Sequence, residues 1–227
     1  MIKNVIFDLD DTLYDESQFV YCGYKQVADY LGEKYNLCSC EIYEDMVEIF
    51  RSRSRRNLFD KVCAKYGINE NIANLVSIYR GTEPILSLYE DARNLLEKLV
   101  GNYGLGIITD GDSQVQRNKI CALGIEKYFT KIIVTDDCGI ECRKPSAEPY
   151  KEMIRHFGGR PDEFVYIGDN PHKDFVTAKK LGIYTVRIRR EIGEHMKTIL
   201  EKEYEADFTI FSLTEVERIL KSLEEQK

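Results

Sequence analysis

A short apolar run that ends in acidic residues constrains the fold of this chain most strongly. Residues 5–7 are Val-Ile-Phe, and consecutive branched and aromatic residues are typical of a strand buried on both faces of a parallel sheet. Asp8, Asp10 and Asp11 follow, and aspartate is a poor strand residue, so we expect the strand to end near Asp8. Ligands of open α/β sheets bind outside the carboxyl ends of the strands. The pattern therefore predicts a site at this strand end.

Asp8 and Asp10 are two residues apart, which suits a backbone that leaves the sheet with both carboxylates turned toward one pocket. Two close carboxylates repel each other unless a cation lies between them. Hard oxygen ligands of this kind suit Mg²⁺. A lone Asp-x-Asp after a strand is more often a solvated turn, so the metal prediction depends on matching residues elsewhere in the chain.

The overall composition narrows the class of protein. The chain has 227 residues, of which 43% are hydrophobic, and a formal net charge of −7. This length fits one large α/β domain, or a core with a small insert. An acidic chain without a long basic tract argues against nucleic acid as a partner. The apolar runs are too short for a membrane span and the N-terminus does not resemble a signal peptide, so we expect no membrane partner and a cytoplasmic location.

The cysteines predict a reduced protein. An odd number in a chain without a secretion signal is typical of free thiols. Zinc held by Cys38, Cys40, Cys138 and Cys142 is an alternative, although their spacings are unlike those of common zinc sites. The seven cysteines are Cys22, Cys38, Cys40, Cys63, Cys121, Cys138 and Cys142.

Helical and α/β patterns occupy different parts of the chain. Residues 15–82 show only helical spacing of apolar residues, with helices expected at 15–36, 41–53, 55–66 and 71–80. From residue 83 onward, strand and helix patterns alternate, with helices expected at 113–123 and 174–181 and a strand at 184–188 among them. This alternation indicates βαβ units and a parallel sheet. The predicted fold class is α/β: a Rossmann-like, three-layer core formed by residues 1–14 and 83–227, with an all-helical domain inserted at 15–82.

Polar residues at or beyond the predicted strand ends form one coherent set. They are Asp8 with Asp10, then Thr109, then Lys144 ahead of Pro145, then Asp169 and Asp174. Strand ends of a parallel sheet meet at one edge, so these side chains can share a site. The carboxylates suit a divalent cation, and the lysine and hydroxyl suit a phosphoryl group, whose oxygens need cationic and hydrogen-bonding partners.

These residues resemble the four motifs of the haloacid dehalogenase-like hydrolase superfamily, in members with a helical cap after the first motif. The motifs match in order, from Asp8-Leu9-Asp10-Asp11-Thr12-Leu13 to Gly168-Asp169-Asn170-Pro171-His172-Lys173-Asp174. The resemblance implies a Mg²⁺-dependent phosphatase that acts on a small phosphorylated metabolite, a sugar phosphate or a nucleotide. A phosphomutase of the same superfamily and a phospho-accepting regulatory module are alternatives. Dehalogenation needs neither Mg²⁺ nor an acid at Asp10, so Asp10 and Asp169 favour phosphoryl transfer.

The resemblance also implies catalytic roles. Asp8 is the expected nucleophile, which forms an aspartyl-phosphate, and Asp10 the general acid and base, with a pKa raised toward working pH. Thr109, the backbone N–H of Asp110 and Lys144 are expected to bind the phosphoryl oxygens.

The expected Mg²⁺ ligands are Asp8, the backbone carbonyl of Asp10, and Asp169, with Asp174 in a supporting position. Asp110 departs from the family pattern, which more often has asparagine there, and we expect it to form a turn or to cap the next helix.

Other candidates carry weaker signals. Four arginines of the insert are candidates for a second anionic group on the substrate, and a solvated basic face is the alternative: Arg51, Arg53, Arg55 and Arg56. Aromatic residues near the start of the insert either line the mouth of the pocket or pack within the insert: Tyr14, Phe19, Tyr21 and Tyr24. His172 is expected to be a loop residue and Lys173 to face solvent.

Overall fold

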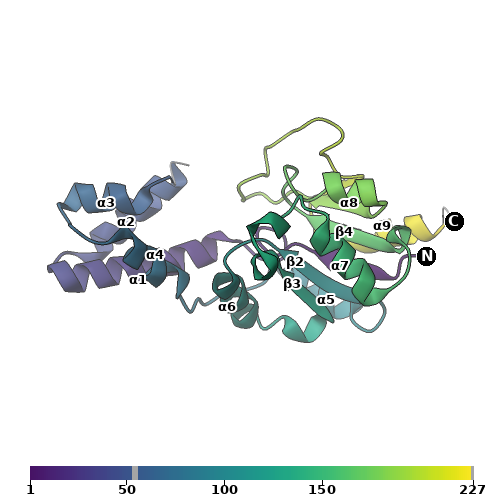
Figure 1. The fold of residues 1–227 in the computed structure, drawn as a ribbon, viewed down its shortest axis with the longest axis horizontal. Coiled ribbons are helices and arrows are strands. Elements are labelled where there is room, and N and C mark those ends of the chain that lie inside the picture. Colours follow the sequence, from purple (N-terminus) through teal and green to yellow (C-terminus); the bar gives the residue numbers. More distant parts are fainter. Residues whose placement is uncertain (53–55, 226–227) are drawn as a thin grey trace. The chain divides into compact units, whose positions relative to one another are not determined.

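The structure is a computed structural model that describes residues 1–52 and 56–225, and it contains two compact units (Figure 1). One unit consists of Met1–Glu16 together with Ser87–Lys227, and the other of Ser17–Leu86. Among the described residues, no helix combines the length and apolar character that crossing a membrane requires.

The first unit is built on a six-stranded parallel sheet. Its strands lie in the order β3-β2-β1-β4-β5-β6, so β1 pairs with β2 on one side and with β4 on the other. Phe7 at the end of β1 is aligned with Ile107 and with Ile167. The strands are β1 (Asn4–Phe7), β2 (Gly104–Thr109), β3 (Lys131–Val134), β4 (Phe164–Gly168), β5 (Tyr184–Ile188) and β6 (Phe208–Ile210).

Helices complete the layers of this unit. They are α5 (Glu90–Leu99), α6 (Ser113–Leu123), α7 (Glu148–Phe157), α8 (Val176–Leu181) and α9 (Val216–Glu225). On one face of the sheet, Ile6 and Tyr166 pack in a buried cluster with Met153 of α7 and Ala178 of α8. Val5 alternates with Ile6 along β1, so it points to the opposite face, and it is also fully buried. The predicted Rossmann-like α/β class is confirmed.

The second unit is helical and has its own apolar core. It comprises α1 (Ser17–Tyr35), α2 (Ser39–Arg51), α3 (Leu58–Tyr66) and α4 (Ile72–Arg80). Leu31 of α1, Ile42 of α2 and Leu75 of α4 are completely buried in one cluster. A Cβ atom on Gly23 would lie 2.5 Å from the ring of Tyr79, so glycine permits the close approach of α1 and α4.

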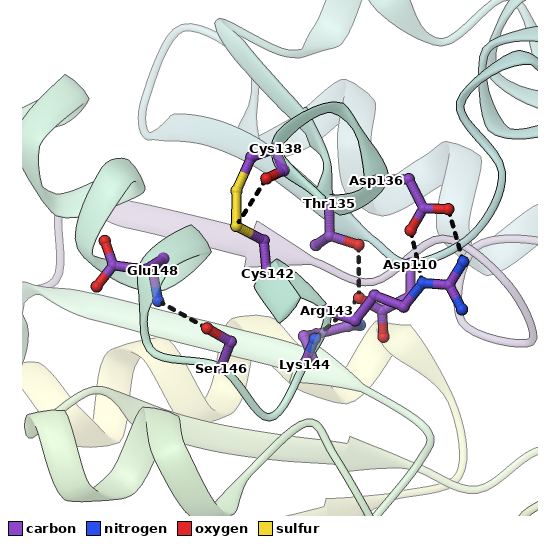
Figure 2. Close-up of a disulfide and its surroundings, with 9 residues drawn as sticks. All are labelled: Asp110, Thr135, Asp136, Cys138, Cys142, Arg143, Lys144, Ser146 and Glu148. Atoms are coloured by element: carbon purple, nitrogen blue, oxygen red, sulfur yellow. Dashed lines mark hydrogen bonds and ion pairs between the residues drawn. A yellow bond between two sulfur atoms is a disulfide. The ribbon is translucent and has the colours of Figure 1, made fainter. Parts of the chain in front are cut away.

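One cysteine prediction is wrong. Cys138 and Cys142 form a disulfide in the loop between β3 and α7 (Figure 2). Two short 3₁₀ segments, Thr135–Cys138 and Ile140–Cys142, fold this loop back so that the two Cα atoms are 6.0 Å apart. The parity of the cysteine count does not reveal such a local pairing. The pairing also removes Cys138 and Cys142 from the zinc set that they would form with Cys38 and Cys40.

Candidate active site

Three neighbouring strands end at the same edge of the sheet and carry the site. Asp8 directly follows β1, Thr109 is the last residue of β2, and Asp169 directly follows β4. Because β1 lies between β2 and β4, these three positions are neighbours in space. The Asp8 backbone N–H donates to the Ile167 carbonyl over 2.8 Å, which continues the pairing of β1 with β4 up to the site.

The ammonium group of Lys144 lies between two of the acids. Its Nζ atom is 2.8 Å from Oδ1 of Asp8 and 2.8 Å from Oδ1 of Asp174. It also donates to the hydroxyl of Tyr166 over 2.8 Å. Burial alone would lower the pKa of Lys144, but Asp174 and Asp8 outweigh burial and raise it well above its usual value. The two acids therefore favour the charged form of Lys144 and hold it against Asp8.

Asp8, Asp169 and Asp174 form a buried group of carboxylates. One oxygen from each lies within 4.8 Å of the other two. Oδ2 of Asp169 is buried and has no hydrogen-bond partner among the described residues. Burial raises the pKa of Asp8 to about 6, and burial and the two neighbouring acids raise the pKa of Asp169 well above its usual value. Mutually repelling oxygen donors with an unsatisfied lone pair fit a divalent cation such as Mg²⁺.

The position of Asp174 depends on a close backbone approach. Its Oδ2 atom accepts a hydrogen bond of 2.9 Å from the backbone N–H of Asn170. A Cβ atom on Gly168 would lie 2.5 Å from the same oxygen, so glycine at this strand end makes room for the carboxylate. Asp174 thereby turns inward ahead of α8 and joins the group instead of starting the helix.

The Asp10 carboxylate lies outside this group and has its own partners. Its Oδ1 accepts hydrogen bonds from the Tyr14 hydroxyl at 2.6 Å and from Nζ of Lys119 at 2.8 Å. Its Oδ2 accepts one from Nε2 of Gln116 at 2.9 Å. Burial would raise the pKa of Asp10, but Lys119 and the hydrogen bonds hold it below its usual value. The expectation that the pKa of Asp10 is raised is therefore wrong.

Gln116 and Lys119 were not predicted from the sequence. Both lie on α6 and are buried beside Val115 and Ile120, on the face that packs into the protein. Gln116 also donates to the Thr109 hydroxyl and so links two of the motifs. Buried lysine and glutamine are rare without partners, so two polar residues on an otherwise apolar helix face were an available signal.

Asp110 has a different role from the one predicted. Asp112, not Asp110, caps α6 by accepting from the N–H groups of Gln114 and Val115. Oδ1 of Asp110 accepts hydrogen bonds from the Thr135 hydroxyl at 2.9 Å and from the Lys144 N–H at 3.0 Å (Figure 2).

Contrary to the expectation from the sequence, Lys173 does not face solvent. Its side chain is 27% exposed, and its ammonium forms an ion pair of 2.9 Å with Oδ2 of Asp110. His172 is exposed, and its ring centroid lies 5.6 Å from that of His195.

The weaker candidates of the insert are only partly described. Arg51 and Arg56 are exposed, whereas Arg53 and Arg55 lie outside the described residues. Phe19 packs edge-on against Tyr79. Tyr21 and Tyr24 both pack edge-on against Phe50, which agrees with packing within the insert.

Comparison with known proteins decides the family. Residues 5–188 match the model of the haloacid dehalogenase-like hydrolases. The chain belongs to this family. A glyceraldehyde 3-phosphate phosphatase of Methanocaldococcus jannaschii is 32% identical to it, over 98% of this chain and 99% of the relative. Pyrophosphatase PpaX of Bacillus velezensis is 26% identical, over 89% of this chain and 91% of the relative.

A solved structure agrees with this assignment. The HAD phosphatase of Thermococcus onnurineus superposes with a TM-score of 0.64 at 28% identity, over 96% of this chain and 98% of that protein. The family resemblance and the expected enzyme class, a phosphoric monoester hydrolase, are confirmed.

Proposed function

We propose that this HAD-like hydrolase is a Mg²⁺-dependent phosphatase that acts through an aspartyl-phosphate on Asp8, with the helical unit as its cap. The environment of Asp8 carries the proposal. One of its oxygens is held by Lys144 at 2.8 Å, and the carboxylate also belongs to the acidic group with Asp169 and Asp174. A carboxylate between a fixed ammonium and a cation site is oriented and charge-compensated, as attack on an anionic phosphoryl group requires.

The reaction has two half-reactions. An oxygen of Asp8 attacks phosphorus, the bond from phosphorus to the leaving oxygen breaks, and Asp10 protonates that oxygen. Asp10 then takes a proton from water, the water oxygen attacks phosphorus, and the bond to Asp8 breaks with release of inorganic phosphate. The donors around Asp10 favour its ionised form, which is the form that the second half-reaction needs.

The residues around this reaction have complementary roles. Lys144 and the hydroxyl of Thr109 are proposed to bind the phosphoryl oxygens, together with the backbone N–H of Asp110. Mg²⁺ would be held by Asp8, Asp169 and the carbonyl of Asp10, with support from Asp174, and would neutralise charge on the transferring group.

We infer that the substrate is a short phosphomonoester chemically similar to glyceraldehyde 3-phosphate. The support is a relative named for that substrate, which is 32% identical and matches nearly the whole chain. A sugar phosphate is thus favoured over a nucleotide.

The test measures release of inorganic phosphate from a panel of phosphomonoesters, with Mg²⁺ and with a chelator. Asp8→Asn should abolish the activity at unchanged thermal stability, and the chelator should abolish it in the wild type. Asp29→Asn, at an exposed residue paired with Lys25, is the control and should retain full activity. Phosphate release by Asp8→Asn at the wild-type rate would refute the proposal, and transfer to a second sugar hydroxyl without release would identify a mutase.

A further inference from the structure

Lys173 is a mostly buried cation that the reaction above does not use. Its ammonium donates to Oδ2 of Asp110 over 2.9 Å. Within residues 1–52 and 56–225, no other side chain or carbonyl accepts a hydrogen bond from this ammonium, which has three donors. The same Asp110 carboxylate accepts a hydrogen bond from the backbone N–H of Lys144, whose ammonium contacts Asp8. The Lys173 ammonium is thus connected to the nucleophile through Asp110 and Lys144, and it has donors left for a ligand.

Asp110 is placed to hold that ammonium still. Its Oδ1 atom accepts hydrogen bonds from the Thr135 hydroxyl and the Lys144 N–H, as Figure 2 shows. Its Oδ2 atom accepts a hydrogen bond from Lys173. Burial would raise the pKa of Asp110, but Lys144 and Lys173 hold it below its usual value. A lone carboxylate at this strand end would repel a phosphoryl group, whereas the pair with Lys173 carries no net charge.

We propose that Asp110 positions Lys173 as a second cationic contact for the phosphoryl group, beside Lys144. The inference rests on the proposed function and adds a binding residue to it. Asp110 follows β2, and Lys173 lies in the loop after β4, so the ion pair joins the loops on the two sides of Asp8. A lysine stem has several rotatable bonds, and fixing its end in the free protein lowers the entropy cost of binding an anion.

The two members of the pair have unequal effects when they are removed. Lys173→Met removes the ion-pair partner of Asp110 but leaves the negative charge, held by Thr135 and the Lys144 N–H, beside the phosphoryl site. Phosphate binding therefore weakens by loss of a contact and by repulsion. Asp110→Asn keeps an acceptor for Thr135 and Lys144 and leaves the cation in place, so the loss is smaller. In the double variant the repulsion is gone, and binding recovers relative to Lys173→Met.

The experiment is a double-mutant cycle on phosphate affinity. Isothermal calorimetry with inorganic phosphate and saturating Mg²⁺ measures Kd for wild type, Lys173→Met, Asp110→Asn and the double variant, and thermal unfolding is followed in parallel. We expect Kd to rise about 10-fold or more in Lys173→Met. The double variant should bind phosphate at least about 3-fold more tightly than Lys173→Met does. Lys173→Arg should recover most of the affinity. Lys180→Met, at an exposed lysine of α8, is the control and should bind like wild type.

The possible outcomes separate the inference from the proposed function. Equal Kd values for wild type and Lys173→Met, with any change confined to thermal stability, would overturn the inference. The ion pair of Lys173 with Asp110 would then have only a structural role. If Lys173→Met does not fold, Lys173→Gln replaces it, and wild-type affinity there overturns the inference in the same way. A wild-type protein that binds no phosphate and hydrolyses no phosphomonoester would instead overturn the proposed function.

Discussion

Nζ of Lys119 lies 2.8 Å from Oδ1 of Asp10, and the lysine side chain is only 3% exposed. The lysine comes from α6, and the acid from the segment after β1, more than a hundred positions earlier in the chain. This contact gives the proposed acid and base a fixed orientation, and it favours the ionised form of Asp10.

Lys119→Met should therefore change the pH dependence of turnover. Removing the lysine charge raises the pKa of Asp10, so the limb of the pH–rate profile that Asp10 controls moves to higher pH. We also expect kcat/KM to fall about 10-fold or more, because Asp10 loses its orientation. The measurement is the pH profile of kcat/KM for one phosphomonoester with Mg²⁺.

The control for this variant lies on the same helix. Arg117 is exposed on α6 and pairs with Asp137, so Arg117→Met should leave both the rate and the profile unchanged. A Lys119→Met enzyme whose profile coincides with that of the wild type would show that Lys119 does not act on Asp10.

Much of the fold follows from the sequence because it depends on local patterns. The helix expected at 113–123 and the strand expected at 184–188 have the predicted bounds. The helix expected to begin at Asp174 instead begins at Val176, since the Asp174 carboxylate turns toward Lys144. The positions of Asp8, Thr109 and Asp169 were also predictable, because parallel strands bring their carboxyl ends to one edge.

The missed features depend on side-chain partners that are distant in sequence. Gln116 and Lys119 reach Asp10, and Lys173 reaches Asp110, through contacts that no spacing rule encodes. The same contacts decide the sign of pKa shifts, so the lowered pKa of Asp10 could not be derived from its motif.

Metal binding should depend on Asp169. Its Oδ2 is buried without a partner among the described residues, so a cation there stabilises the folded protein by binding. At about 100 times the Kd, Mg²⁺ should add about 2.7 kcal/mol to the free energy of unfolding of the wild type and far less to that of Asp169→Asn. Thermal unfolding at increasing Mg²⁺ concentrations measures this difference. Equal increases in Tm for both proteins would place the metal elsewhere.

Asp91 should stabilise the protein in a pH-dependent way. Its Oδ2 pairs with Arg190 at 2.7 Å and accepts from the N–H of Leu213 at 2.8 Å, and Arg190 also donates to the carbonyl of Thr12. Burial would raise the pKa of Asp91, but these partners lower it. A carboxylate whose pKa is lower in the folded than in the unfolded state stabilises the folded protein. This contribution is present in full above a pH of about 4, and it is lost as the pH falls through the pKa of the carboxylate in the folded protein.

Asp91→Ala should accordingly lower the free energy of unfolding by about 3 kcal/mol at pH 7. The deficit should shrink as the pH falls from about 4 through the lower pKa of Asp91 in the folded protein, because the wild-type carboxylate is protonated over that range. Urea unfolding across this pH range measures it. Asp162→Ala, in an exposed pair with Arg160, is the control and should cost about 0–1 kcal/mol. A deficit for Asp91→Ala that does not depend on pH would contradict the assignment.

The identity of the phosphorylated residue tests the central claim most directly. Wild-type protein is mixed with Mg²⁺ and a phosphomonoester, quenched in acid during turnover, digested and analysed by mass spectrometry. The account predicts a phosphoryl group on the peptide that contains Asp8, and none on the same peptide from Asp8→Asn. Turnover with the phosphoryl group on a different residue, or with no phosphorylated peptide under conditions that preserve acyl phosphates, would contradict it.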